Sequence, residues 1–197
     1  GAGLPIETVV EIGNAYFGTT PLEADESIRF ANLWVHPDYV PLESGVIGSL
    51  GENDVAILEL QWDGEPDPIW FNTRELSRDD VGTEITSVGY GITEDSTDPQ
   101  STKRSAVLTV DDVDNMFVYS NNRTNENEAN ICSGDSGGPQ YAWDQANDRW
   151  LQWSVHSWGD ENCTVQSGST RTDVVSDWIL ERIEEVHGTT DVCEINN

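Results

Sequence analysis

The stretch ICSGDSGGP, residues 131–139, carries the most informative pattern in this 197-residue chain. Two glycines follow Ser136 and another stands two residues before it, so the backbone can turn tightly and bring its amide groups close to a reacting carbonyl. This pattern indicates acyl transfer by a serine hydroxyl. Because a hydroxyl is a weak nucleophile, it also needs a general base, normally a histidine that a carboxylate holds in place.

The composition limits the kind of molecule that carries this turn. Hydrophobic residues make up 36% of the chain, which is enough to bury one substantial core in a single domain. Asp and Glu number 37 against nine Lys and Arg, and the formal net charge of −28 would repel nucleic acid and anionic membranes. A solvated surface accounts for this charge more simply than a docking face for a basic partner.

The chain has no apolar run long enough to cross a membrane, which takes about 18 residues. Its first residues lack the basic start and apolar core of a signal peptide, so we expect any targeting segment to have been removed.

Short apolar segments separated by turn-rich stretches predict an all-β fold. These segments are ETVVEI (7–12), IRFANLWV (28–35), DVAILEL (54–60), EITSVGYG (84–91), SAVLTV (105–110), NMFVYS (115–120) and WLQWSVHSWG (150–159). Residues 173–187 differ, because apolar side chains recur there at three- and four-residue spacing, which predicts an amphipathic helix with Asp173 as its N-cap. A change in character over Pro66–Thr73 suggests a boundary between two halves.

The motif GDSGGP (134–139) resembles the nucleophile motif of the trypsin-like, chymotrypsin-fold serine peptidases. Further matches follow in family order: WVHPDY (34–39), NDVAILEL (53–60), VGYG (88–91), HSWG (156–159) and TRTDVVSDWI (170–179). The short stretch between KRSAVLTV and NICSGDSGGP is similar to the compact bacterial members.

The resemblance implies an all-β fold of two packed six-stranded antiparallel β-barrels with a C-terminal α-helix. We expect one peptidase domain over 1–197, with the remainder of an incomplete N-terminal barrel in 1–72, the C-terminal barrel in 73–172 and the helix in 173–187.

The resemblance also assigns roles around the nucleophile. It makes Ser136 the nucleophile and the backbone N–H groups of Gly134 and Ser136 the oxyanion hole, while Asp54 holds the base. Asp135 matches the residue that pairs with a new N-terminal amine when a zymogen is cleaved.

Other positions of the resemblance concern the substrate and the cysteines. Ser157, Trp158 and Gly159 match the strand that pairs with the substrate backbone, with Ser157 near Asp54. Cys132 and Cys163 match a disulfide that joins the two walls of the specificity pocket. The third cysteine, Cys193, is then left over, and in a secreted protein an odd cysteine suggests a partner outside the chain.

The sequence differs from the family at the expected base. The family carries it in a TAAHC-like motif before the triad aspartate, and no such motif occurs here. The three histidines are His36 in a surface loop, His156 beside the pocket strand, and His187 at a helix end, where a basic residue suits the helix dipole. None stands where the base is expected.

Three hypotheses follow. In the first, a separate or unrecorded N-terminal segment supplies the histidine, with Cys193 as a possible tether, and the complete protein is a secreted serine endopeptidase. In the second, the domain is an inactive pseudoprotease that acts as a binding module. In the third, a binding event or a cleavage delivers the segment to an enzyme that is inactive until then. Intact Ser136, Asp54 and Asp135 favour an enzyme, as does the exposed edge that a barrel without its first strands would present.

The last expectations concern the residue before the cut and a metal ion. The family has Asp at the position of Asn130 when it accepts Lys or Arg, so a basic preference is not expected. His156 and Ser133 match polar groups of members that cut after glutamate, whose carboxylate both could hydrogen-bond; the alternative is a pocket for uncharged side chains. No cofactor is required. Glu23, Asp25 and Glu26 offer oxygen ligands for calcium, although in so acidic a chain a solvated loop is the simpler explanation of these residues.

Overall fold

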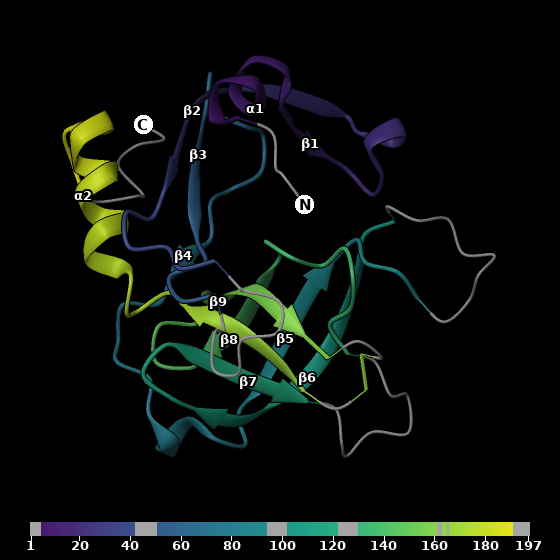
Figure 1. Ribbon diagram of the computed structural model, residues 1–197, viewed down its shortest axis with the longest axis vertical. Coiled ribbons are helices and arrows are strands. Elements are labelled where there is room, and N and C mark those ends of the chain that lie inside the picture. Colours follow the sequence, from purple (N-terminus) through teal and green to yellow (C-terminus); the bar gives the residue numbers. More distant parts are fainter. Residues whose placement is uncertain are drawn as a thin grey trace.

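The computed structural model describes residues 5–41, 51–93, 102–121, 130–160, 163–164 and 166–190. Its strands form two sheets, one above the other in the view of Figure 1. The predicted architecture, mostly β with a C-terminal helix, is confirmed.

The N-terminal sheet has three antiparallel strands in the order β1–β2–β3. They are β1 (Asn14–Phe17), β2 (Glu26–Val35) and β3 (Ala56–Leu60), with a short 3-10 turn, η1 (Pro21–Glu23), between the first two. Strand β2 pairs with both neighbours, and Ile28 at its centre is fully buried. In the part of the chain that the structure describes, β3 has no strand on its other side, so the sheet ends there as an open edge.

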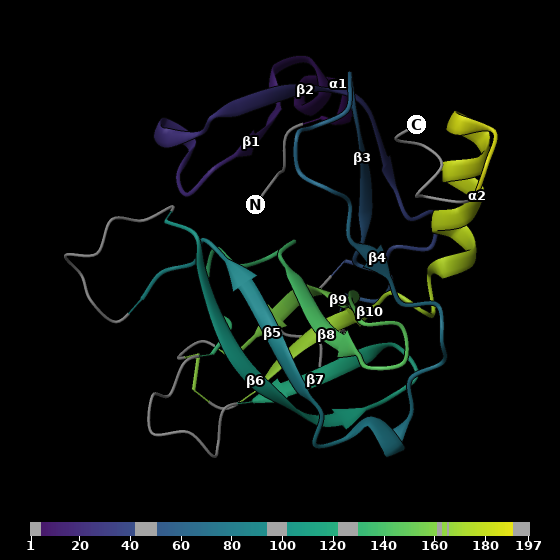
Figure 2. The same ribbon diagram turned by 180° about the vertical axis from the view of Figure 1, so that it is seen from behind.

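The second sheet closes on itself into a six-stranded antiparallel barrel (Figure 2). The strands follow one another in the order β10–β7–β6–β5–β8–β9, and pairing of β9 with β10 closes the ring. Their bounds are β5 (Glu84–Gly89), β6 (Arg104–Val113), β7 (Phe117–Asn121), β8 (Pro139–Asp144), β9 (Arg149–Gly159) and β10 (Ser167–Arg171). A two-residue strand, β4 (Trp70–Phe71), lies parallel to β9 on the outside, and the turn η2 (Arg78–Asp80) precedes β5.

The barrel core follows the alternation of the strand sequences. Leu108 and Val110 on β6 are two residues apart and both point inward, as the pleat of a strand requires. The core consists of Leu76, Ile85, Leu108, Val110, Val113, Val118, Ile131, Ala142 and Trp153. It holds the strands whose ends carry the candidate site.

One predicted strand is a helix. Residues 7–12 were expected in extended conformation because they are rich in valine and isoleucine, but Ile6–Ile12 form helix α1. Ile6, Val9 and Val10 stand at positions i, i+3 and i+4, so they share one helical face. This prediction was wrong because the β-branched content was weighted above the helical spacing of the same residues.

The C-terminal helix α2 spans Ser176–His187, within the predicted residues 173–187. Its N-cap is Val175, and no side chain caps it. The prediction that Asp173 is the cap was therefore wrong. The Asp173 carboxylate instead pairs with Arg171 at 2.5 Å and accepts the Leu76 backbone N–H at 2.9 Å. A buried guanidinium attracts the carboxylate more strongly than a free helix amide does.

Arg171 is the centre of this buried arrangement. Its guanidinium donates to the backbone carbonyl of Leu76 at 2.7 Å and to that of Asp114. The side chains of Arg171 and Asp173 are 6% and 3% exposed, so water contributes little to solvating either charge. The pair fixes the segment before η2 against the end of β10.

Candidate active site

The turn around Ser136 is held by backbone hydrogen bonds at both ends. The amide of Asp135 donates to the Cys132 carbonyl at 3.0 Å, and the amide of Gly138 donates to the Asp135 carbonyl at 2.9 Å. Gly134 and Gly137 have φ angles of 97° and 82°, which only glycine adopts readily. The Ser136 side chain is exposed at the tip, just before β8 begins.

Two backbone amides of this turn are available as donors. In the described part of the chain, the N–H groups of Gly134 and Ser136 donate to no protein acceptor. Both residues are exposed. Such donors can bind the oxygen of an acyl group as negative charge develops on it.

The Asp135 carboxylate stabilises the turn by accepting two backbone hydrogen bonds. One of its carboxylate oxygens accepts the Gly91 amide at 2.7 Å and the other accepts the Cys132 amide at 2.9 Å. A Cβ atom on Gly89 would come within 1.9 Å of this carboxylate, and one on Gly91 within 2.5 Å. The glycines of VGYG therefore make room for Asp135.

Asp54 approaches the site from the other sheet. Asn53 adopts a left-handed conformation (φ 53°), and its side chain donates to the Asp38 carbonyl at 3.0 Å, so the chain turns sharply just before Asp54 and β3. The Asp54 carboxylate accepts a hydrogen bond from Ser157 Oγ at 2.7 Å. Ser157 follows His156, whose backbone bonds to Gly137 and Gly138, so a short chain of contacts links Asp54 to the Ser136 turn.

The three histidines are all described, and two of them have ring or hydrogen-bond partners away from Asp54 and Ser136. The His36 ring packs against Trp178 of α2, with 4.8 Å between ring centroids. His156 is buried, and its Nδ1 lies 3.2 Å from Ser169 Oγ. His187 ends α2. None of them hydrogen-bonds to Asp54 or Ser136 within the described residues.

His156 is uncharged at neutral pH. Burial lowers its pKa to about 4, although the Asp135 charge and the Val88 carbonyl act in the opposite direction. A neutral imidazole can hydrogen-bond a substrate but cannot form an ion pair with it.

The low pKa of His156 predicts a pH-dependent stability. The unfolded chain, with a histidine pKa near 6.5, takes up the proton first, so the free energy of unfolding should fall as the pH drops from 6.5 towards 4. The loss should amount to about 3 kcal/mol and should level off below pH 4. Urea unfolding across this range should show a weaker pH dependence in His156→Gln than in wild type. Equal slopes in the two proteins would contradict the prediction.

The predicted substrate strand is the end of β9. Ser167 and Gly168 of β10 lie opposite Gly159 and Trp158. A Cβ atom on Gly168 would come within 2.4 Å of the Trp158 indole. Only glycine at this position leaves space for the Trp158 ring. The Cys132–Cys163 disulfide that the resemblance implied is confirmed, with an S–S distance of 2.04 Å.

Ser133 and Asn130 lie in the segment that leads to Ser136. Ser133 is exposed, and Asn130 Oδ1 accepts the Ile131 amide at 2.9 Å. Cys193 lies outside the described residues.

A buried polar cluster begins directly after the nucleophile turn. Gln140 Nε2 donates to Ser120 Oγ at 2.8 Å and to Ser87 Oγ at 3.2 Å, and its Oε1 accepts from Ser154 Oγ at 2.6 Å. Sequence reasoning missed these residues. The signal was present, because Gln140 stands two positions from buried Ala142, and so has the inward phase of its strand.

The acidic loop that suggested calcium shows no converging ligands. The Glu26 carboxylate accepts the Glu65 amide at 3.0 Å. Across the described ranges, no group of three or more His, Cys, Asp or Glu side chains could hold a metal ion. Calcium binding by Glu23, Asp25 and Glu26 stays a prediction.

Comparison with known proteins agrees with this geometry. Residues 9–179 match the family model named Trypsin. The chain belongs to the trypsin family. Over 181 residues it is also 26% identical to a protein named ovochymase from Halocynthia roretzi. This match covers 83% of the present chain but only 11% of that protein's length, so the chain spans about a ninth of its relative.

Membership of the trypsin family sets the general chemistry. The domain is of the serine protease type. A disulfide within the domain is typical of trypsin-family proteins from oxidising compartments. None of the helices in the described segments is long and apolar enough to cross a membrane.

Proposed function

We propose that the complete protein is a serine endopeptidase that acts through an acyl-enzyme at Ser136. The Ser136 hydroxyl attacks the substrate carbonyl and passes its proton to a histidine base, and the developing oxyanion accepts hydrogen bonds from the amides of Gly134 and Ser136. Asp54 orients the base. The amine then leaves with the proton, and water releases the acyl group. The observation that carries the proposal is an exposed Ser136 in a turn whose Gly134 and Ser136 amides have no protein acceptor among the described residues.

We further propose that the base comes from a segment outside these 197 residues. In support, Asp54 bonds to Ser157, and among the described residues none of His36, His156 and His187 hydrogen-bonds to Asp54 or Ser136. Cys193 is the candidate tether for such a segment. Peptide mapping without reduction should join it to a peptide that is absent from this sequence; a free, alkylatable Cys193 would argue against the tether.

Chemical rescue of the 197-residue chain tests the nucleophile and the missing base together. A fluorophosphonate should label Ser136 slowly, and free imidazole should accelerate the labelling in proportion to its concentration, because it substitutes for the base. Ser136→Ala should abolish the label, whereas Ser133→Ala, three residues away, should keep it.

Mass spectrometry of the labelled peptide identifies the modified residue. EDTA should leave the rate unchanged, since the proposed chemistry uses no metal. If a folded chain shows no labelling at any imidazole concentration, the proposal of an enzyme is wrong and a binding module is favoured.

The substrate preference is the finer part of the proposal. Asn130 carries no charge to attract Lys or Arg, and its side-chain oxygen is occupied by the Ile131 amide, which leaves its NH₂ group as a donor. His156 and Ser133 are further polar groups. We propose glutamate before the cut, or its amide glutamine, because both present an oxygen acceptor of the same reach.

A panel of four peptides tests this preference. Substrates identical except for Glu, Gln, Phe or Arg before the cut should rank with Glu and Gln above Phe, and with Arg slowest. His156→Ala should reduce the advantage of Glu over Phe. If the substrate with Phe or Arg is cleaved faster than the one with Glu, the proposed preference is wrong. The proposal that the protein is a serine endopeptidase is then unaffected.

We also propose that the protein works outside the cell, in an oxidising compartment. The Cys132–Cys163 disulfide supports this, since such bonds are rare in reducing compartments.

A further inference from the structure

The hydrogen-bond directions within the buried cluster around Gln140 follow from its distances. Ser154 Oγ lies 2.6 Å from Gln140 Oε1, a length typical of O–H···O bonds and short for N–H···O bonds. The oxygen of the amide therefore faces Ser154. Both hydrogens of the Gln140 NH₂ group are then donated, one to Ser120 Oγ at 2.8 Å and one to Ser87 Oγ at 3.2 Å.

The cluster continues from Ser120 to Ser167 at the start of β10. Ser167 Oγ donates to the Ser120 carbonyl at 3.2 Å, and the two Oγ atoms are also 3.2 Å apart. Because Ser167 uses its one hydrogen on the carbonyl, Ser120, which accepts from Gln140, is the donor in the Oγ pair. Ser167 Oγ is left with a lone pair and no hydrogen, so it can only accept a further hydrogen bond.

Ser167 lies at the inner end of a space beside the predicted substrate strand. It pairs with Gly159 at the end of β9. A Cβ atom on Gly159 would lie 3.6 Å from the Ile131 carbonyl oxygen and 3.9 Å from Ser167 Cβ, so the absent side chain leaves this position open. Gly159 is exposed and Ser167 is fully buried, so the space leads inward. The Cys132–Cys163 disulfide connects the segments on its two sides.

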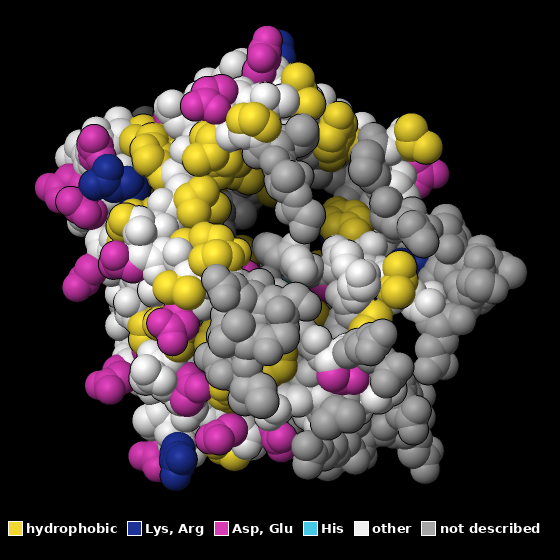
Figure 3. Space-filling view, in the orientation of Figure 1, with side chains coloured by type: hydrophobic (Ala, Val, Ile, Leu, Met, Phe, Trp, Pro, Cys, Tyr) yellow, Lys and Arg dark blue, Asp and Glu magenta, His cyan; other side chains and the backbone are white. Residues whose placement is uncertain are grey.

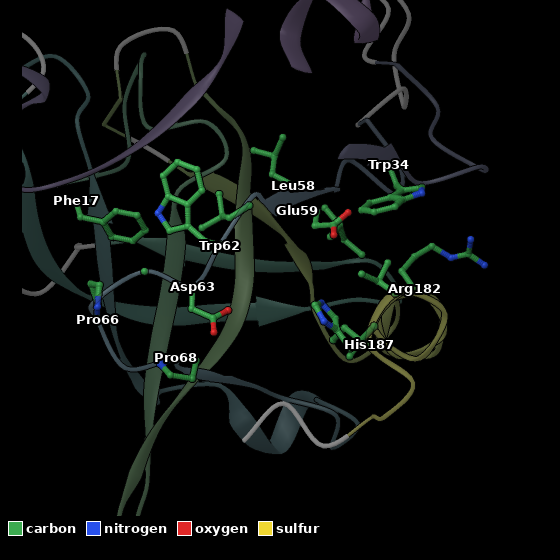
Figure 4. Close-up of a pocket in the computed structure, with 15 residues that line it drawn as sticks. Phe17, Trp34, Leu58, Glu59, Trp62, Asp63, Pro66, Pro68, Arg182 and His187 are labelled. Carbon is green, nitrogen blue, oxygen red and sulfur yellow. The ribbon is translucent and has the colours of Figure 1, made fainter. Parts of the chain in front are cut away.

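A separate cavity of about 290 Å³ lies between the N-terminal sheet and α2 (Figure 4). Its lining residues come from β1, β2, β3, residues 62–68 and α2, and none comes from residues 130–171. This cavity therefore does not include the Ser136 turn or the end of β9. The side chain before the cut belongs in the space beside Gly159 instead.

The charges around this space oppose an anionic side chain. The polar side chains assigned to it, Asn130, Ser133, His156 and Ser167, carry no positive charge at neutral pH; burial keeps the pKa of His156 at about 4. The nearby Asp135 carboxylate is negative and acts on His156. Acidic side chains also outnumber basic ones on the face shown in Figure 3, in keeping with the net charge of −28. An ionised glutamate would therefore be buried without a cation to pair with, which is costly.

We infer that the site prefers glutamine to glutamate before the cut and that Ser167 is the residue that decides between them. This rests on the proposed function. A primary amide has both a donor and an acceptor, so its NH₂ group can donate to Ser167 Oγ while its oxygen accepts from the Asn130 NH₂ group. A carboxylate has acceptors only and would face the Ser167 lone pair. To donate to it, Ser167 would have to withdraw its hydrogen from the Ser120 carbonyl.

Competition for labelling tests this preference with the 197-residue chain. Three acetylated tripeptide amides, identical except for Gln, Glu or Met at the last position, should slow imidazole-assisted fluorophosphonate labelling of Ser136 by occupying the substrate site. The glutamine peptide should act at a concentration about ten- to a hundredfold lower than the glutamate peptide, because a site built for an amide rejects an analogue that lacks the donor. Methionine has a similar length without the charge or the hydrogen bonds, so its peptide should lie between them.

Two serine variants of the same cluster identify the deciding residue. Ser167→Ala removes the acceptor and should reduce the advantage of the glutamine peptide over the glutamate peptide about tenfold. Ser87→Ala is the matched control, because Ser87 is also a buried serine that accepts from Gln140 but has no bond to Ser167. This variant should keep the advantage. Urea unfolding checks that both variants are folded, and the comparison of peptides on wild type stands without them.

The outcomes separate this inference from the proposed function. Labelling of Ser136 in the absence of peptide reports on the nucleophile alone. If labelling occurs and the glutamate peptide competes as well as the glutamine peptide, or if no peptide competes, the inference is wrong and the proposed nucleophile stands. If Ser87→Ala reduces the advantage as much as Ser167→Ala does, the cluster acts through its packing and Ser167 does not decide the preference.

Discussion

Replacing Asp54 with asparagine should slow acyl-enzyme formation at Ser136 about 10⁴-fold in protein that contains the histidine base. The carboxylate stabilises the imidazolium that forms during attack and selects the correct tautomer, and an amide does neither. Ser157 Oγ donates to Asp54 at 2.7 Å, so the carboxylate is already fixed in place. The loss should therefore come from chemistry rather than from misfolding.

The measurement is kcat/KM for a peptide substrate, compared between Asp54→Asn and wild type. Ser157→Ala is the matched control, and it should cost far less because it removes one hydrogen bond and no charge. With free imidazole as the base, the effect of Asp54→Asn should shrink, since a diffusing base is not held by Asp54. Less than a tenfold loss with the attached base would remove Asp54 from the mechanism.

Replacing Arg171 with methionine should destabilise the domain by about 3–5 kcal/mol. The change leaves the Asp173 carboxylate, 3% exposed, as a buried charge without its partner. It also frees the carbonyls of Leu76 and Asp114. Few folded domains of this size lose so much from one residue outside the hydrophobic core.

Urea unfolding provides the measurement, with an exposed ion pair as control. Arg74 and Asp80 are 2.7 Å apart, against 2.5 Å for Arg171 and Asp173, but the Arg74 side chain is 58% exposed. Arg74→Met should therefore cost about 1 kcal/mol or less. The double variant Arg171→Met, Asp173→Leu should recover part of the loss, because no unpaired charge remains. Equal costs for Arg171→Met and Arg74→Met would contradict the buried-pair account.

Local features of the fold could be predicted from residue types. Gly134 and Gly137 occupy positive φ angles, and a turn of this shape needs glycine whatever surrounds it. Residues 176–187 have helical apolar spacing and form a helix. Strand β6 shows alternation that matches its burial, with Leu108 and Val110 both buried. These patterns depend on a few neighbouring residues, which is why they can be read along the chain.

The prediction failed where two local signals competed or where a distant partner intervened. Residues 7–12 combine β-branched side chains with helical spacing, and the spacing prevailed. Asp173 is a good capping residue, but Arg171 and the Leu76 amide compete for its carboxylate and hold it away from the helix. The polar cluster around Gln140 was missed because its three serine partners lie on other strands.

The sequence by itself therefore determined the shape of the Ser136 turn, the strand alternation and the family to which the chain belongs. Only the tertiary structure decided that Ser157 meets Asp54 across 103 positions of the chain and that Arg171 meets Leu76 across 95. It also decided that, among the described residues, β3 pairs with a strand on one side alone. Turn and strand preferences are properties of short stretches of backbone, whereas a long-range contact depends on how strands from distant parts of the chain are paired and in which register.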